Sequence, residues 1–176
     1  MTRKIAIYGG SFNPPTNGHK EVIKKLSNFE EIILVPSYKH AWGKQVISFH
    51  QRVEMLQLFI DDLNIDNLRI SLIEESIFSI HNNVVTTYDV LNALQNKYVK
   101  DDLTFVIGPD NFYNFNKFYK HTSILEKWSI LVIPEIIKIR STLIRTKINE
   151  KKSIDGLTTN NVLKYIKSKN LFRTTE

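Results

Sequence analysis

Short apolar runs alternate along this chain with stretches in which apolar residues recur at helical spacing. The runs predict buried strands over residues 4–8, 30–36, 68–72, 103–107 and 129–133. The helical stretches predict helices from about Gly18, from Ser48 to Leu63, over 86–97 and over 158–169, with shorter pieces after Asp110. Strands that alternate with helices predict an α/β, Rossmann-like parallel sheet with helices on both faces.

The predicted strand ends indicate where a ligand would bind. In open parallel sheets, ligands lie beyond the carboxyl ends of the strands, at the point where the strand order reverses. We therefore expect the chemistry just after Tyr8, Pro36 and Ile107. On the helix that begins near Ser48, we expect the buried stripe to consist of Val53, Leu56, Ile60 and Leu63.

Composition narrows the class of protein. The chain has 176 residues without a repeat or a linker before its last helix, which predicts one domain over residues 1–176. Lys and Arg number 24 against 18 Asp and Glu, so the net charge of +6 suits a partner rich in phosphate. The basic residues are spread along the chain, which argues against a nucleic-acid partner.

Several features are absent from the sequence. The chain has no cysteine, which excludes thiolate chemistry and cysteine-ligated metal sites, and no carboxylate cluster indicates a dedicated metal site. No apolar run is long enough to cross a bilayer, and the N-terminal segment lacks the features of a signal peptide. We expect a cytoplasmic protein without a membrane partner; the sequence leaves open whether it forms a homo-oligomer.

The stretch GGSFNPPTNGH, from Gly9 to His19, follows the first predicted strand. Two glycines allow a tight turn and a close approach to a ligand, and a helix that begins near Gly18 directs its amides at an anion. Thr16 and His19 offer donors to phosphate oxygens. Taken alone, His19 fits a surface turn better than a binding site.

The stretch IRSTLIR, from Ile139 to Arg145, is the second candidate. Ser141 or Thr142 can cap a helix and present donors to a phosphate, and Arg145 lies one turn further on. Alone, this stretch is more often an ordinary helix start. A second helix N-terminus that faces the first would bind a triphosphate from both ends and neutralise its charge.

Together, the two stretches resemble the nucleotidyltransferase superfamily, whose signatures are a Gly-rich segment that ends in (H/T)xGH and a late ISSTxIR. Within it the best match is the nicotinate or nicotinamide mononucleotide adenylyltransferase family, and the resemblance covers nearly all 176 residues. The C-terminal tail, 156–172, is similar to the closing helix of that family. The resemblance implies a nucleotidyltransferase-type fold in which the helices from about residue 141 complete the ATP site.

Three further segments support the resemblance. The segment 35–56 is similar to the loop in which a family lysine approaches substrate phosphate, and Lys44 matches it better than Lys39. In VVTTYDVLNAL, Thr87 matches a threonine near the pyridine mononucleotide. In FVIGPDNFYNFNKF, Gly108 and Asp110 match a nucleotide-binding pair, and Phe118 stands where the family has a tryptophan near the pyridine ring. Core packing explains Phe118 equally well.

The residues implied by the resemblance form three overlapping sets. The catalytic set is His19, Thr16, Lys44 and Arg145. The ATP-binding set is Gly9, Gly10, Ser11, Phe12, Gly18, His19, Gly108, Asp110, Ile139, Ser141, Thr142 and Arg145. The mononucleotide-binding set is Ser11, Phe12, Lys44, Thr87 and Phe118.

The sequence also departs from the family pattern. Thr16 stands where bacterial relatives usually have histidine, and Arg140 replaces the first serine of ISST, so that a hydroxyl is lost and a charge appears. The segment between Ile133 and Ile139 is shorter than expected and lacks the usual Arg-Pro. The short segment is the departure that bears on the pocket wall.

The implied activity is transfer of AMP from ATP to nicotinate or nicotinamide mononucleotide, with release of pyrophosphate and with Mg²⁺ as cofactor. Two alternatives stay open. The TNGH sequence and the chain length also fit a phosphopantetheine adenylyltransferase, although the segment around Thr87 and the C-terminal tail argue against it. Arg140 and the short loop also fit a nucleotide-binding protein that has lost turnover.

Overall fold

The structure is a computed structural model that describes residues 2–39 and 47–173. In these ranges five strands form one parallel sheet, in the order β3-β2-β1-β4-β5. The strands are β1 (Lys4–Gly10), β2 (Glu31–Pro36), β3 (Leu68–Ile70), β4 (Asp102–Ile107) and β5 (Ser129–Val132). The predicted parallel α/β architecture is confirmed.

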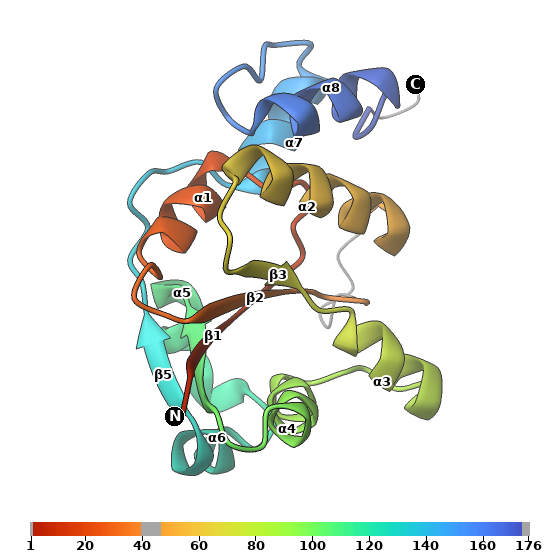
Figure 1. The fold of residues 1–176 in the computed structure, drawn as a ribbon. Helices are drawn as coiled ribbons and strands as arrows, with labels where there is room; N and C mark the ends of the chain where they lie inside the picture. The colour runs from red at the N-terminus through yellow and green to blue at the C-terminus, as the bar shows by residue number, and fades with distance from the viewer. Residues whose placement is uncertain (1, 40–46, 174–176) are drawn as a thin grey trace.

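Helices cover both faces of the sheet (Figure 1). One side carries α1 (Asn17–Lys24) and α2 (Phe49–Leu63), with α7 (Ser141–Asn149) and α8 (Asn160–Ser168) outside them. The other side carries α3 (Ile73–His81), α4 (Thr87–Lys97) and α6 (His121–Lys127). The short helix α5 (Pro109–Tyr113) and a 3₁₀ turn (Phe115–Lys117) follow β4.

Alternation along the central strand divides the buried side chains into two clusters. Ile5 and Ile7 of β1 pack toward the α4 side with Leu91, whereas Ala6 packs toward the α2 side with Leu56. This period of two is the pattern of a strand that is covered on both faces. Because β1 is buried from both sides, its carboxyl end is held firmly at the centre of the sheet.

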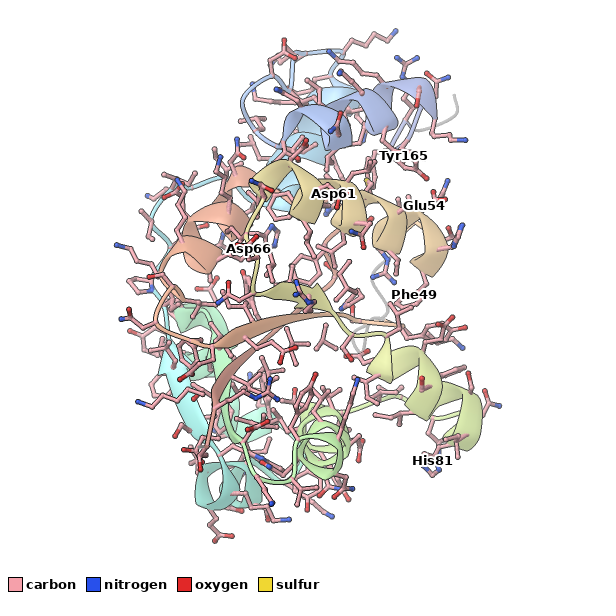
Figure 2. All side chains as sticks on the ribbon, in the orientation of Figure 1. Phe49, Glu54, Asp61, Asp66, His81 and Tyr165 are labelled. Carbon is pink, nitrogen blue, oxygen red and sulfur yellow. The ribbon has the colours of Figure 1, made fainter. Side chains whose placement is uncertain are left out.

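The C-terminal helix α8 packs on α2. Tyr165 donates its hydroxyl hydrogen to the carboxylate of Glu54, and these side chains project toward each other from the two helices (Figure 2). The backbone N–H of Asn161 donates to Asp62 over 2.8 Å. These contacts fix the last helix, and with it the segment that follows α7, against the side of the sheet that carries α1.

Two sequence expectations about elements were wrong in detail. The fully buried stripe of α2 consists of Arg52, Met55, Leu56 and Phe59, so Leu56 is buried as predicted, whereas Ile60 and Leu63 are only half-buried against the same cluster. The helix α3 was not predicted, and none of its residues is fully buried. In the described residues, no helix is long and apolar enough to span a membrane.

Candidate active site

Two cavities flank the carboxyl end of β1. In the sheet, β1 lies between β2 and β4, and the cavities are named here after these two neighbours. The β2-side cavity measures about 240 Å³ and the β4-side cavity about 420 Å³. Both are lined by Gly9, Gly10 and Ser11. The strand order reverses between β1 and β4, so these cavities occupy the position at which parallel sheets bind ligands.

The turn after β1 differs from the one that the glycines predicted. The strand runs through Gly9 and Gly10, and the positive φ of 45° falls on Phe12 instead. Phe12 is fully buried and lines neither cavity, so the structure does not bring it together with the other predicted ligand-binding residues. A β-carbon on Gly10 would lie 3.4 Å from the Phe12 ring, at the lower limit of ordinary van der Waals contact.

Thr16 and His19 form a capping box at the start of α1. The Thr16 hydroxyl oxygen accepts from the Gly18 amide over 3.1 Å, and the Thr16 amide donates to His19 Nδ1 over 2.9 Å. Because Nδ1 accepts a hydrogen bond, the single hydrogen of the neutral ring lies on Nε2. Burial lowers the pKa of His19 to about 4. The ring, which lines the β4-side cavity, is therefore a neutral donor near pH 7.

Side-chain donors from the C-terminal half hold the loop that precedes α1. Their acceptors are backbone carbonyls at 2.7–2.8 Å: Ser141 donates to Pro14, Arg145 to Asn13 and Thr158 to Pro15. One hydrogen bond runs in the opposite direction: the Thr16 hydroxyl donates to the Ile139 carbonyl over 2.9 Å. The two helix starts predicted to face one phosphate chain are thus joined directly.

The start of α7 was predicted imprecisely. Its N-cap is Arg140, which makes no side-chain capping bond, so neither Ser141 nor Thr142 caps the helix. The Ser141 hydroxyl instead donates to the Pro14 carbonyl, and the Thr142 hydroxyl accepts from Arg145 over 3.2 Å. Arg140, Ser141, Thr142 and Arg145 all line the β4-side cavity.

The β2-side cavity contains two of the predicted mononucleotide residues, Thr87 and Phe118. The Phe118 ring also packs against Phe115, with 5.1 Å between the ring centroids, which confirms the packing hypothesis, while a contact with the pyridine ring stays a prediction. Lys39, the second choice for the phosphate-binding lysine, lines the cavity. Lys44, the first choice, lies outside the described residues.

Arg52 is a site residue that the sequence did not reveal. Its side chain is almost fully buried and donates to the backbone carbonyls of Ser11 at 2.9 Å, Tyr38 at 3.2 Å and Ile47 at 3.3 Å. It therefore ties together the loops after β1 and β2. The sequence did contain a signal for its burial. Arg52 precedes the buried Met55, Leu56 and Phe59 of α2 by three, four and seven residues, and this spacing places it on the same face of the helix.

Glu74, at the start of α3, was also missed. Its carboxylate lines the β2-side cavity and accepts from the Tyr38 amide over 2.8 Å. Burial raises the pKa of Glu74 to about 7, despite the opposing effects of that hydrogen bond and of the Arg52 charge. Both polar backbone groups of Tyr38 are thus held, one by Glu74 and the other by Arg52.

Comparison with known proteins shows the family. Residues 7–147 match the family described as cytidylyltransferase-like. This chain belongs to that family and is a nucleotidyltransferase. The matched range contains both predicted motifs and every described residue that lines the two cavities.

Relatives of this nucleotidyltransferase cover almost its whole length. A structure from Vibrio parahaemolyticus assigned as a nicotinate-nucleotide adenylyltransferase is 38% identical, with a TM-score of 0.87, 99% of this chain covered and 98% of that one. A Borrelia turicatae protein named "Probable nicotinate-nucleotide adenylyltransferase" is 28% identical over 96% of this chain and 97% of its own. The nicotinic acid mononucleotide adenylyltransferase of Plasmodium falciparum, solved with NaAD, is 22% identical at a TM-score of 0.78, with 97% of each chain covered, and shows the same fold.

Most of the predicted ligand-binding residues of the nucleotidyltransferase meet around the two cavities. The β4-side cavity is lined by Gly9, Gly10, Ser11, Thr16, Gly18, His19, Gly108, Asp110, Ile139, Ser141, Thr142 and Arg145. In the described residues no group of three or more His, Asp or Glu side chains is arranged to hold a metal ion.

Proposed function

We propose that this chain is a nicotinate-nucleotide adenylyltransferase, which transfers AMP from ATP to nicotinate mononucleotide, or to its nicotinamide counterpart, and releases pyrophosphate. The observation that carries the proposal is that the two cavities share Gly9, Gly10 and Ser11. A ligand in each cavity would bring its phosphate to the same short backbone segment. The names of the relatives, which match nearly the whole chain, supply the substrate class.

ATP is assigned to the larger, β4-side cavity. His19 and Arg145 lie at its phosphate end, beside the starts of α1 and α7, where helix amides and dipoles favour an anion. Gly108 and Asp110, which follow β4, lie at the adenosine end. The residues from Ile139 to Thr142 also line this cavity.

The pyridine mononucleotide is assigned to the β2-side cavity. Phe118 offers an aromatic face to the pyridine ring, and Thr87 offers a hydroxyl. Lys39 supplies a cation from within the described residues, and Lys44 stays a prediction for the same role. We infer that Arg52 and Glu74 act as positioning residues, because they fix the backbone of Tyr38 next to Lys39.

The transfer itself needs little acid–base chemistry. The mononucleotide phosphate, whose second ionisation lies near pH 6, is already an anion at neutral pH. One of its oxygens forms a bond to the α-phosphorus of ATP while the bond from that phosphorus to the bridging oxygen of pyrophosphate breaks. Catalysis then consists of positioning and charge neutralisation. His19 contributes a neutral hydrogen-bond donor. Thr16 acts as a positioning residue, because its amide donates to His19 Nδ1 while its hydroxyl donates to the Ile139 carbonyl.

Magnesium would enter with ATP. When bound, the ion would neutralise charge on the departing pyrophosphate. We expect the ion to be held mainly by substrate oxygens and water, as Mg²⁺ usually is in sites that bind substrate phosphates. His19, Thr142 and Arg145 would face the phosphate oxygens that the ion leaves free.

Pyrophosphate release tests the proposal. The protein is incubated with Mg-ATP and, separately, with nicotinate mononucleotide, nicotinamide mononucleotide or phosphopantetheine. We expect turnover with the pyridine mononucleotides and faster turnover with the nicotinate form. Faster turnover of phosphopantetheine would contradict the assignment, and ATP binding without pyrophosphate release from any acceptor would identify a protein that has lost catalysis.

A further inference from the structure

The guanidinium group of Arg140 joins two carboxylates at the adenosine end of the β4-side cavity. Nε and Nη2 donate to the two oxygens of Glu135, at 2.8 and 3.2 Å, and Nη1 lies 2.9 Å from an Asp110 oxygen. Glu135 lies in the loop after β5, and Asp110 lies in α5 after β4. All three residues line the cavity.

The Asp110 part of this arrangement contributes little to stability. The side chains of Arg140 and Asp110 are 61% and 73% exposed, and exposed ion pairs contribute only about 0–1 kcal/mol, whereas Glu135 is 32% exposed and its two-point contact with Arg140 is the stronger pair. Arg140 is also the N-cap of α7, where the helix dipole disfavours a cation and where a capping side chain is lost. A charge in an unfavourable position, held by two acids beside a ligand cavity, indicates a role toward the ligand.

The hydrogen-bond geometry indicates which part of the guanidinium can contact a ligand. Three of its five N–H groups face carboxylates, because Nε and Nη2 face Glu135 and Nη1 faces Asp110. The flat face of the group, and one N–H on each of Nη1 and Nη2, take part in none of these contacts. A guanidinium face stacks on aromatic rings and nucleic-acid bases, and the two-point contact with Glu135 fixes its plane in advance.

We propose that Arg140 is an adenine-stacking residue and that Glu135 is its positioning residue. The inference rests on the proposed function for the assignment of ATP to this cavity. It explains the departure of this chain from the ISST pattern: the serine position carries a planar cation that covers the base, in a chain whose loop between β5 and α7 is short.

The test compares Arg140→Ser, Arg140→Lys and Glu135→Gln with the parent protein. Equilibrium binding is measured for ATP, for CTP and for inorganic tripolyphosphate, which lacks adenosine. We expect both Arg140 variants to weaken ATP binding by about 10-fold, the scale of one stacked base, and to leave tripolyphosphate binding within about 2-fold. Preference for ATP over CTP should fall in both, since the flat face is lost in lysine as well as in serine.

Glu135 is tested through its coupling to Arg140. Glu135→Gln should weaken ATP binding when Arg140 is present and have no further effect in the Arg140→Ser background. Arg145→Lys serves as the matched control, because it should weaken tripolyphosphate and ATP together. The mononucleotide KM should stay unchanged in the Arg140 variants.

Three results would overturn the inference: unchanged ATP binding in both Arg140 variants, tighter ATP binding in Arg140→Ser, or equal losses for ATP and tripolyphosphate. Each is measured without an acceptor substrate. A failure of the proposed function, seen as no dinucleotide formed by the parent protein, is therefore distinguishable from a failure of this inference.

Discussion

Gly18 lies so close to the Ile139 carbonyl that a β-carbon on Gly18 would be 2.4 Å from that oxygen. The contact joins the start of α1 to the segment that leads into α7, where Thr16 also bonds to Ile139. Because the obstacle is backbone, a side chain at residue 18 must separate the two helix starts.

We therefore predict that Gly18→Ala lowers kcat/KM for ATP by about 10²-fold, the scale of a 1 Å displacement of catalytic groups. It should also destabilise the fold by about 1–3 kcal/mol, as overpacking does. Steady-state kinetics and thermal melts measure the two effects. Gly108→Ala is the stability control, because its β-carbon would meet no protein atom within 4 Å and its Tm should match that of the parent. If kcat/KM for ATP in Gly18→Ala equals that of the parent protein, the close contact between the starts of α1 and α7 is not required for activity.

His19 should act as a donor and not as a base. We expect His19→Ala to lower kcat by about 10²- to 10³-fold, as for a lost oxyanion donor, and His19→Asn to recover part of the loss. Because the pKa of His19 is lowered to about 4, no His19 ionisation should appear in the rate between pH 6 and 8. An inactive Asn variant, together with a rate that rises through an ionisation assigned to His19 by NMR, would favour the base.

The same pKa makes a prediction about stability. Between about pH 4 and 6.5 the unfolded chain binds more protons at His19 than the folded chain, so the free energy of unfolding should fall as the pH falls through this window. His19→Asn should remove that contribution. Urea denaturation at pH 4.5 and pH 7 measures it, and an identical pH dependence in the variant would show that His19 is not held neutral by the fold.

Glu74 should have the opposite dependence. Its pKa is raised to about 7, so the folded chain holds a proton at Glu74 that the unfolded chain has released, and stability should fall as the pH rises from about 4.5 to 7. Glu74→Gln keeps an acceptor for the Tyr38 amide without the charge. The Tm difference between this variant and the parent should increase from pH 5 to pH 8. The exposed Glu126→Gln is the control, and a constant difference for Glu74→Gln would contradict the prediction.

Arg145 should be sensitive to a substitution that preserves its charge. The guanidinium donates both to the Asn13 carbonyl, at 2.7 Å, and to the Thr142 hydroxyl, at 3.2 Å, which a single ammonium group cannot reproduce. We predict that Arg145→Lys lowers kcat/KM for ATP by about 10-fold, a loss typical of one charge-assisted hydrogen bond. Unchanged ATP kinetics would place Arg145 outside the phosphate-binding site, and Lys152→Arg is the control on the exposed surface.

The sequence predicted the sheet because each strand is a short apolar run and the helices between strands carry recurrent apolar residues. The rule that parallel strands direct their carboxyl ends to a common edge indicated a site after Tyr8 and Ile107, and the family resemblance assigned His19, Asp110 and Arg145 to it. It missed Arg52 and Glu74, because their roles depend on backbone groups of Ser11 and Tyr38, which are distant in the sequence. The Phe12 side chain enters the core because a positive φ turns the chain there, and local pattern does not reveal this.

The measurement that tests the account most directly follows the phosphorus atoms of ATP. The protein is incubated with Mg²⁺, nicotinate mononucleotide and ATP labelled at either the α- or the γ-phosphate, and the products are separated. The account predicts that the α label enters a dinucleotide of the NAD type and that the γ label leaves in pyrophosphate, in equal amounts. Release of the γ label as inorganic phosphate, or an α label that stays in ATP or AMP, would contradict it.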